Sequence, residues 1–267
     1  QAVDQRLDLG RHLRHAVEAG TLEAHYQPQL DLRTGRVTGF EALLRWTHPE
    51  RGPISPAEFI PVAEESGLIV PIGRWVIAEA CRQAAAWRRA GIDGMRVSVN
   101  LSLRQARDVE LVSHIERVLR ETGVPGDGLE LEITETLLME EAESSIALLR
   151  RIRALGVQLA IDDFGTGYSS LVYLKRLPID TLKIDKEFVG DLTRDPDDEA
   201  ITATVITMAH SLGLNVIAEG VETQRQRDYL EALDVDEIQG FWLAKPMTAD
   251  RLGTFVASIG RRLCQPR

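Results

Sequence analysis

From residue 95 onward the sequence alternates between short apolar runs and longer segments with helical periodicity. The six apolar runs span residues 95–101, 129–134, 157–161, 181–184, 215–218 and 236–239. Alternation of this kind is typical of parallel sheets built from strand–helix units, because the helix after each strand covers a face of the sheet. It predicts an α/β fold.

Two further strand-like runs, residues 24–32 and 36–46, come earlier in the chain. They are joined by Arg33-Thr34-Gly35, a short segment typical of a hairpin turn. With the hairpin pair included, the strand count and the length of 267 residues match a TIM-like (β/α)8 barrel whose opening hairpin is an irregularity. A doubly wound open sheet is the alternative architecture.

The formal net charge of −10 argues against binding of DNA or RNA by a basic surface, because such proteins cluster Lys and Arg. Cys81 and Cys264 match neither a disulfide framework nor a zinc pattern, which favours a reducing, cytoplasmic location. Charged residues interrupt every apolar run before it reaches the about 18 residues that a spanning helix needs. We therefore expect no direct membrane contact from this segment.

We expect residues 1–267 to form a single domain, because the sequence has no internal repeat and no convincing linker. The acidic run from Arg194 to Glu199 is the best candidate for an exposed loop. The chain begins with Gln1 rather than Met, which indicates a piece excised from a longer multidomain protein and leaves open a membrane anchor upstream.

Asp162 and Asp163 directly follow the apolar run 157–161 and precede a loop with two glycines, Gly165 and Gly167. Successive strand residues point to opposite sides, so one of the two carboxylates must face the core or a ligand if the strand continues. An ionised carboxylate placed there needs a basic residue or a metal ion beside it. A helix-capping aspartate next to a surface aspartate is the alternative interpretation.

Polar side chains stand at the ends of all six runs, where ligands bind in barrels and in open α/β sheets alike. They are Asn100, Glu132, Asp162 with Asp163, Lys183, Glu219 and Gln239. Glu41, on the second strand of the hairpin, adds a carboxylate if the inner face of that strand presents it. We expect these side chains to converge at one mouth.

Carboxylate and amide oxygens suit Mg²⁺ or Mn²⁺ rather than zinc, and none of these strand ends has a histidine. Five carboxylates at one mouth would repel one another, so two ions that share a bridging carboxylate, Asp162, are the natural arrangement. Two such ions about 3.5–4 Å apart clamp the attacking and leaving oxygens of an in-line displacement at phosphorus. This arrangement indicates phosphodiester hydrolysis.

Seven short segments of the chain contain these residues together with their neighbours in the sequence. They are Glu41-Ala42-Leu43, Ser98-Val99-Asn100-Leu101-Ser102, Leu131-Glu132-Ile133-Thr134-Glu135, the run from Asp162 to Ser170, Lys183-Ile184-Asp185, the run from Ala218 to Thr223, and Gln239-Gly240-Phe241 with Lys245-Pro246. As a set they resemble the motifs of the EAL-domain cyclic di-GMP phosphodiesterases of bacterial signalling. The resemblance extends from about residue 7 to residue 259.

The resemblance implies a TIM-like barrel whose opening strand is antiparallel to the others. It also implies metal-dependent hydrolysis of cyclic di-GMP to linear pGpG, with two Mg²⁺ or Mn²⁺ ions as cofactors and Ca²⁺ as an inhibitor. Homodimerisation through the region of the 163–170 loop and control by an upstream sensor or cyclase domain are further expectations of the resemblance.

The resemblance assigns roles to single residues. The first-metal ligands are Glu41, Asn100, Glu132 and Asp162, and the second-metal ligands are Asp162, Asp163 and Glu219. Lys183 matches the lysine that positions the attacking water, Gln239 a glutamine near that water, and Glu135 the glutamate that holds the 163–170 loop.

The same resemblance implies substrate contacts for Gln27 and Arg45, while Pro61 is a candidate wall of the base pocket. An ordinary surface ion pair is the alternative for Arg45. Two other functions stay open. One is a cyclic di-GMP receptor or regulatory scaffold that does not hydrolyse its ligand, although such relatives usually lack metal ligands. The other is an unrelated two-metal barrel enzyme of the enolase kind, which leaves the Gln239 match unexplained.

Overall fold

The structure is a computed structural model and describes residues 2–134, 142–165 and 174–262. Eight strands form a closed barrel in the order β1, β9, β8, β7, β6, β5, β4 and β2, and the pairing of β2 with β1 closes it. The strands are β1 (Leu22–Asp31), β2 (Val37–His48), β3 (Gly52–Ile54), β4 (Arg96–Leu101), β5 (Leu129–Thr134), β6 (Gln158–Phe164), β7 (Thr181–Ile184), β8 (Asn215–Ala218) and β9 (Glu237–Gln239). The predicted TIM-like barrel is confirmed, and the open-sheet alternative is wrong.

The opening strand β1 is the irregular member of the barrel. It runs antiparallel to both of its neighbours, β2 and β9, whereas β2, β4, β5, β6, β7, β8 and β9 are parallel to one another in turn. The short strand β3 pairs antiparallel with β2 and lies outside the closed circle. The antiparallel opening strand implied by the resemblance is therefore confirmed.

A tight turn connects β1 to β2. The backbone N–H of Thr34 donates to the Asp31 carboxylate at 2.6 Å, and that of Gly35 donates to the Asp31 carbonyl at 2.9 Å. Gly35 has a φ of 65°, a left-handed conformation that glycine adopts at little cost. The hairpin predicted from Arg33-Thr34-Gly35 is thus confirmed.

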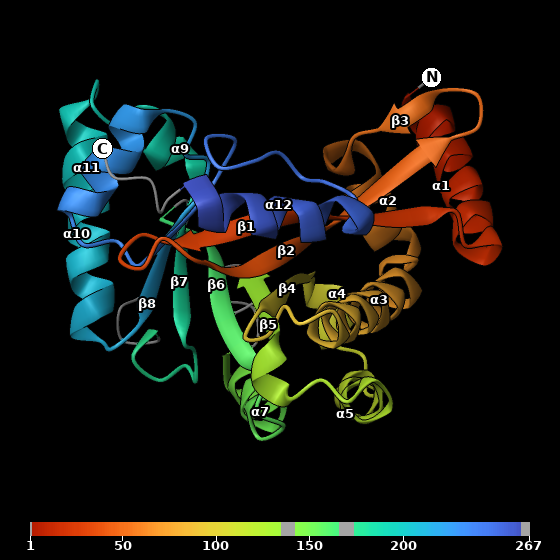
Figure 1. Ribbon diagram of the computed structural model, residues 1–267. Coiled ribbons are helices and arrows are strands. Elements are labelled where there is room, and N and C mark those ends of the chain that lie inside the picture. Colours follow the sequence, from red (N-terminus) through yellow and green to blue (C-terminus); the bar gives the residue numbers. More distant parts are fainter. Residues whose placement is uncertain (1, 135–141, 166–173, 263–267) are drawn as a thin grey trace.

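Helices surround the barrel, and α12 lies across β1 and β2 in the view of Figure 1. The helical segments are α1 (Ala2–Ala19), α2 (Pro56–Ser66), α3 (Ile69–Arg89), α4 (Leu103–Ala106), α5 (Leu111–Thr122), the 3-10 turn η1 (Gly126–Gly128), α7 (Ala142–Arg153), α9 (Lys186–Gly190), α10 (Pro196–Ser211), α11 (Gln224–Ala232) and α12 (Ala249–Arg262). Within the described ranges, no helix has both the length and the apolar character needed to cross a bilayer.

The acidic run that was expected to be a loop instead begins a helix. The Asp195 carboxylate accepts a hydrogen bond from the Asp197 backbone at 2.9 Å, and Pro196 occupies the first helical position of α10, where its missing N–H costs nothing. Asp197, Asp198 and Glu199 fill the first turn, where the helix dipole stabilises negative charge. The charges are therefore a helix-start signal.

Aromatic side chains fill the space between the hairpin strands and the helices that cover them. The Trp87 ring of α3 packs edge-on against Tyr26 of β1 and lies 4.7 Å from the Phe40 ring of β2, measured between centroids. Trp46 of β2 packs edge-on against Phe59 of α2. All five side chains are buried, so they anchor α2 and α3 to the hairpin.

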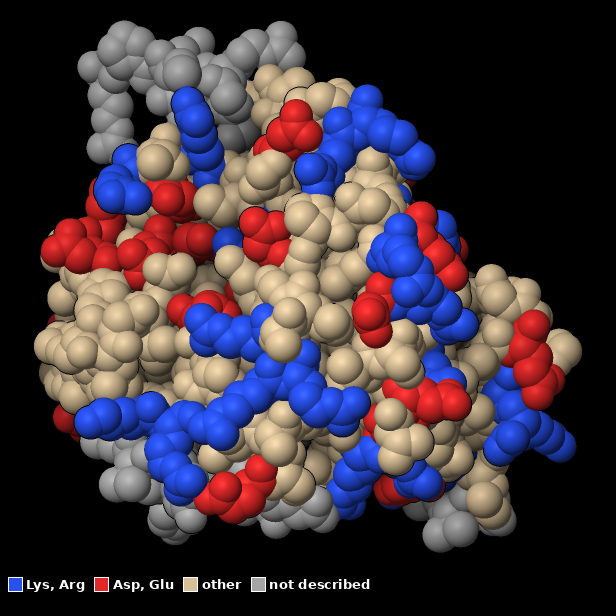
Figure 2. Space-filling model, turned by 90° about the horizontal axis from the view of Figure 1, so that it is seen from below, with Lys and Arg blue, Asp and Glu red and all other residues tan. Residues whose placement is uncertain are grey.

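Charges of both signs cover the underside of the molecule. Figure 2 shows a band of Lys and Arg across this face, with Asp and Glu between and around them. The negative net charge of the chain is therefore not evenly distributed.

The floor of the barrel depends on a close approach between two backbone segments. A β-carbon on Gly126 would lie 2.2 Å from the carbonyl oxygen of Leu155, just before β6. We expect Gly126→Ala to lower the free energy of unfolding by about 1–3 kcal/mol, the usual cost of overpacking. Urea denaturation measures this change.

Gly253→Ala is the matched control, because a β-carbon at this position of α12 would meet no heavy atom within 4 Å. It should leave the stability unchanged or raise it by up to about 1 kcal/mol through better helix propensity. Equal stability of the two variants would contradict the close approach at Gly126.

Candidate active site

The polar strand ends meet at one mouth of the barrel. They are Glu41 on β2, Asn100 on β4, Glu132 on β5, Asp162 and Asp163 on β6, Lys183 on β7, Gln239 on β9, and Glu219 directly after β8. Adjacent strands bring them together because the parallel strands all end on the same side. The expected convergence is present in the structure, while the individual roles of these residues stay predictions.

The Lys183 ammonium is the centre of the cluster. Its Nζ lies 2.6 Å from Glu219 Oε1, 2.7 Å from Glu132 Oε2 and 3.2 Å from Asp162 Oδ1. Glu41 Oε2 is farther away, at 4.0 Å. The lysine side chain is fully buried. One positive charge thus faces four carboxylates, so this cluster has an excess of negative charge.

This excess shifts the pKa values of the cluster. Burial alone would lower the pKa of Lys183, but the surrounding carboxylates outweigh it and raise that pKa well above the usual value. Burial also raises the pKa of Glu132 well above its usual range, with the charge of Glu41 adding to it, and raises the pKa of Glu219 to about 8. Burial therefore favours the neutral form of both carboxyl groups, relative to an exposed glutamate.

Glu41 is the exception among the buried carboxylates. Burial favours its neutral form, but Lys183 and hydrogen bonds from Gln239 and Asn100 together lower its pKa. Asn100 Nδ2 donates to Glu41 Oε1 at 2.7 Å, and Gln239 Nε2 donates to Glu41 Oε2. Two amides therefore hold Glu41 ionised and in one orientation.

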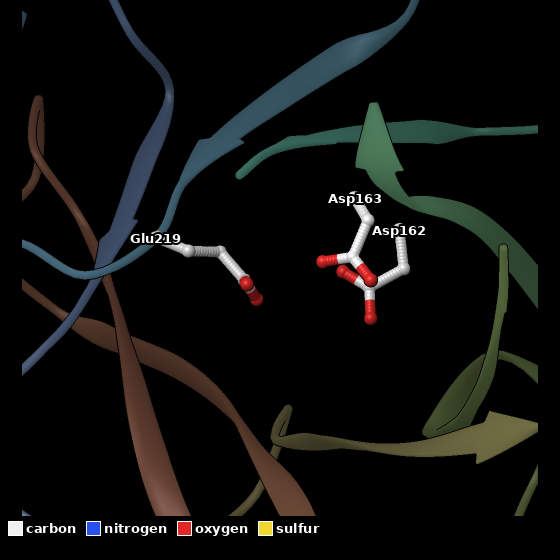
Figure 3. A group of neighbouring side chains, drawn as sticks. All are labelled: Asp162, Asp163 and Glu219. Atoms are coloured by element: carbon white, nitrogen blue, oxygen red, sulfur yellow. The ribbon is translucent and has the colours of Figure 1, made fainter. Parts of the chain in front are cut away.

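Asp162 and Asp163 present their carboxylates on the same side, although neighbouring strand residues normally alternate. Asp163 has a φ of 54°, and the register between β6 and β7 shifts between Ile161 and Phe164. Such an irregularity turns a side chain that would otherwise point away. Figure 3 shows both aspartates facing Glu219 across the mouth.

Asp185 is an additional acid beside this pair. Its carboxylate caps α9 by accepting a hydrogen bond from the Glu187 backbone at 2.6 Å. Burial raises the pKa of Asp163 to about 7, and a hydrogen bond with Asp185 and the charge of Asp162 add to the shift. Asp185 therefore contacts Asp163 through a side-chain hydrogen bond. The described contacts include no ion pair between Asp185 and Lys183.

The donor set fits divalent cations bound through oxygen. One oxygen atom from each of Asp162, Asp163 and Glu219 lies within 4.8 Å of the other two. Both Glu132 carboxylate oxygens are buried without a well-directed hydrogen bond, as is one oxygen each of Asp162 and Glu219. Buried oxygens of this kind are the atoms that a hard cation satisfies.

A largely apolar pocket of about 450 Å³ adjoins the mouth. Pro61 and Ile60 of α2 wall it, and Arg45 of β2 and Asn100 also line it. The structure thus places Arg45 and Pro61 in one pocket beside a predicted metal ligand. Gln27 lies elsewhere, since its Nε2 donates to the Ala244 carbonyl at 3.2 Å and its Oε1 accepts from Gln239.

Two parts of the predicted site lie outside the described residues. These are Glu135 and residues 166–170 of the loop that it was expected to hold.

From the sequence, no role was assigned to two residues of the barrel interior, Gln29 and Arg96. Gln29 and Arg96 form a polar chain below Gln239. The spacing of Gln27 and Gln29, two residues apart on β1, was the available signal, because both face the interior of the barrel.

Comparison with known proteins identifies the family. Residues 11–246 match the model of the EAL domain. The chain is 44% identical over 253 residues to the bifunctional diguanylate cyclase/cyclic di-GMP phosphodiesterase MucR of Pseudomonas aeruginosa, covering 95% of this chain and 37% of MucR. It is 45% identical over 249 residues to the cyclic di-GMP phosphodiesterase PdeR of Escherichia coli, covering 93% of this chain and 37% of PdeR. The chain spans little more than a third of the length of these relatives.

Solved structures agree with this result. The MucR phosphodiesterase in complex with cyclic di-GMP superposes with a TM-score of 0.89 at 44% identity, covering 92% of this chain and 99% of that one. The FimX EAL domain of Pseudomonas aeruginosa bound to cyclic di-GMP gives a TM-score of 0.82 at 27% identity, covering 90% and 96% of the two chains. The barrel, its antiparallel opening strand and the motifs at its mouth thus have one common explanation: this chain belongs to the EAL domain family.

Proposed function

We propose that this chain hydrolyses cyclic di-GMP, opening one of its two phosphodiester bonds to give linear pGpG. The observation that supports this most directly is the convergence of the oxygen donors around the buried Lys183. MucR and PdeR, named as cyclic di-GMP phosphodiesterases, support the choice of substrate.

Two divalent cations, Mg²⁺ or Mn²⁺, fit this function. We assign the first ion to Glu41, Asn100, Glu132 and Asp162, and the second to Asp162, Asp163 and Glu219. When bound, such ions supply Lewis acidity toward water and toward the phosphate oxygens. We expect Ca²⁺ to inhibit, because it is larger and less strict in its geometry.

Lys183 contributes positive charge independently of the cations. The high pKa of its ammonium keeps it protonated, so it can only donate hydrogen bonds. In our proposal it orients the attacking water and offsets negative charge that grows on the phosphate in the transition state. Its burial keeps bulk water from screening that charge.

Gln239 and Asn100 orient the first carboxylate of the site. Both amides donate to Glu41, one to each of its oxygens. A carboxylate held at both oxygens is pre-organised, so binding of a cation costs little side-chain entropy. The geometry of Glu41 on β2 therefore depends on β4, its neighbour in the barrel, and on β9, the next strand beyond β1.

The pocket beside the mouth suits a nucleobase. Its apolar wall, which includes Ile60 and Pro61, can cover a flat purine, and the planar guanidinium of Arg45 matches phosphate geometry. We therefore assign Arg45 and Pro61 to substrate binding. Gln27, which contacts Gln239 and does not line this pocket, is assigned to the same role.

The relatives also bear on which other domains and copies this chain assembles with. Because the chain spans little more than a third of MucR and PdeR, we propose that a sensor or cyclase domain lies upstream of it in the full-length protein. We also propose a cytoplasmic location for the domain described by this chain. Homodimerisation through the region of residues 163–170 stays a prediction, since most of that loop lies outside the described residues.

Metal removal provides the first test. With Mg²⁺ or Mn²⁺, the purified chain should convert cyclic di-GMP to pGpG, as followed by chromatography. EDTA should abolish the product, and Ca²⁺ should suppress it, because the carboxylates alone cannot activate water. Binding of cyclic di-GMP without product in every metal would instead favour the receptor function.

Replacement of Lys183 provides the second test. Lys183→Met should lower kcat at least about 100-fold, because the charge beside the phosphate is lost. It should also lower the melting temperature of the metal-free protein, since four buried carboxylates lose their only close cation among the described residues. Steady-state kinetics and thermal denaturation measure the two effects.

Lys175→Met is the matched control, because Lys175 is exposed and the described ion pairs of the cluster involve Lys183 and not Lys175. It should match the wild type in both measurements. A Lys183→Met variant with wild-type turnover would contradict the role assigned to this lysine.

A further inference from the structure

A chain of buried polar side chains crosses the barrel interior below the mouth. Gln29 of β1 is fully buried and lies opposite Gln239 in the pairing of β1 with β9. Its Nε2 donates to Gln239 Oε1 at 3.0 Å and, at 3.4 Å, to Ser98 Oγ. Its Oε1 accepts from Arg96 Nη2 at 3.0 Å. Gln29 therefore connects the mouth to a charged group deeper in the barrel.

The groups at the two ends of this hydrogen-bonded series, Arg96 and Glu41, decide which way the amides of Gln29 and Gln239 are oriented. Arg96 has only donors, so the atom of Gln29 that faces it must be the amide oxygen. The amide nitrogen of Gln29 then faces Gln239 and requires an oxygen there. Gln239 is left with its nitrogen toward Glu41, which as a carboxylate can only accept. Both ends thus demand the same orientation of the two amides.

Arg96 is itself held firmly. Its guanidinium forms an ion pair with Glu237 at 2.6 Å and with Glu130 at 3.2 Å. Thr38 Oγ1 donates to Glu237 at 2.9 Å, and Thr181 Oγ1 donates to Glu130 at 3.2 Å. These contacts come from four strands, so the anchor of the chain belongs to the barrel frame and not to a loop.

The backbone leaves room for the contact between Arg96 and Gln29. Gly39 of β2 faces Gln29 in the hairpin register. A β-carbon on Gly39 would lie 2.7 Å from Arg96 Cγ and 3.2 Å from Gln29 Oε1. The missing side chain at this position thus allows the guanidinium and the amide to meet.

We propose that Gln29 is a positioning residue that orients the Gln239 amide toward Glu41. It touches neither the substrate nor the predicted cations, and it acts through Gln239. The inference rests on the proposed function, because Glu41 is there a metal ligand. Residues that orient metal ligands in this way commonly affect metal affinity as strongly as they affect turnover.

The test is a double-mutant cycle. Gln29→Met keeps the side-chain volume but cannot orient the Gln239 amide. We expect it to lower kcat for cyclic di-GMP about tenfold with KM within twofold, the effect of one lost hydrogen bond. In a Gln239→Met background the same substitution should change kcat less than twofold. Additive losses, or a wild-type kcat for Gln29→Met, would overturn the proposal.

Titration of the protein with Mn²⁺ in the absence of substrate provides a readout that does not need turnover. Gln29→Met should weaken Mn²⁺ binding about tenfold. Thr38→Val is the matched control, because it removes a hydroxyl that contacts Glu237 and, at 3.5 Å, the backbone carbonyl of Gln29, while the side-chain amide of Gln29 keeps its partners. It should bind Mn²⁺ like the wild type. Equal weakening in both variants would overturn the proposal.

Two further outcomes distinguish a failure of the role proposed for Gln29 from a failure of the proposed hydrolysis of cyclic di-GMP. If the wild type binds Mn²⁺ but lacks turnover, the proposed function fails, and the Mn²⁺ titrations alone decide the role of Gln29. If Gln29→Met does not fold, Gln29→Glu replaces it, because a glutamate keeps the volume and the Arg96 contact. An ionised glutamate cannot donate to Gln239, so weakened Mn²⁺ binding is again expected, and wild-type binding would overturn the proposal.

Discussion

One buried ammonium facing four carboxylates is the interaction on which the rest of this mouth depends. Lys183 lies within 3.2 Å of carboxylate oxygens from three strand ends, and no bulk water separates them. A single positive charge cannot neutralise this set, and burial together with the neighbouring carboxylates raises the pKa values of Glu132 and Glu219. The cluster therefore has an excess of negative charge, which bound divalent cations can neutralise.

Holding such a cluster requires a rigid frame. Every member lies on a barrel strand or directly after one, so the backbone hydrogen bonds of the sheet fix the distances between the carboxylates. The antiparallel hairpin closes the barrel and brings Glu41 beside Asn100 and Gln239. The frame deviates from regular geometry at Asp163, where the left-handed residue aims a second carboxylate into the mouth.

The barrel interior separates two polar regions with different tasks. At the mouth, four carboxylates face the single ammonium of Lys183, and buried oxygens of Glu132, Asp162 and Glu219 lack a well-directed hydrogen bond. Deeper in the barrel, Arg96 is matched by Glu130 and Glu237, and hydroxyl groups satisfy the remaining oxygens. Gln29 and Gln239 join the two regions, so the balanced network orients the unbalanced one.

The sequence by itself determined the alternation of strands and helices, the hairpin and the polar strand ends, because these follow from local periodicity and from turn chemistry. It could not determine the conformation at Asp163, since strand alternation alone predicts opposite directions for Asp162 and Asp163. Nor did it identify the acidic run at Asp195 as a helix start or Gln29 as a partner of Gln239, which is 210 residues away. Only the closed barrel decided these features, because pairing between distant strands sets the register and so chooses which side chains meet.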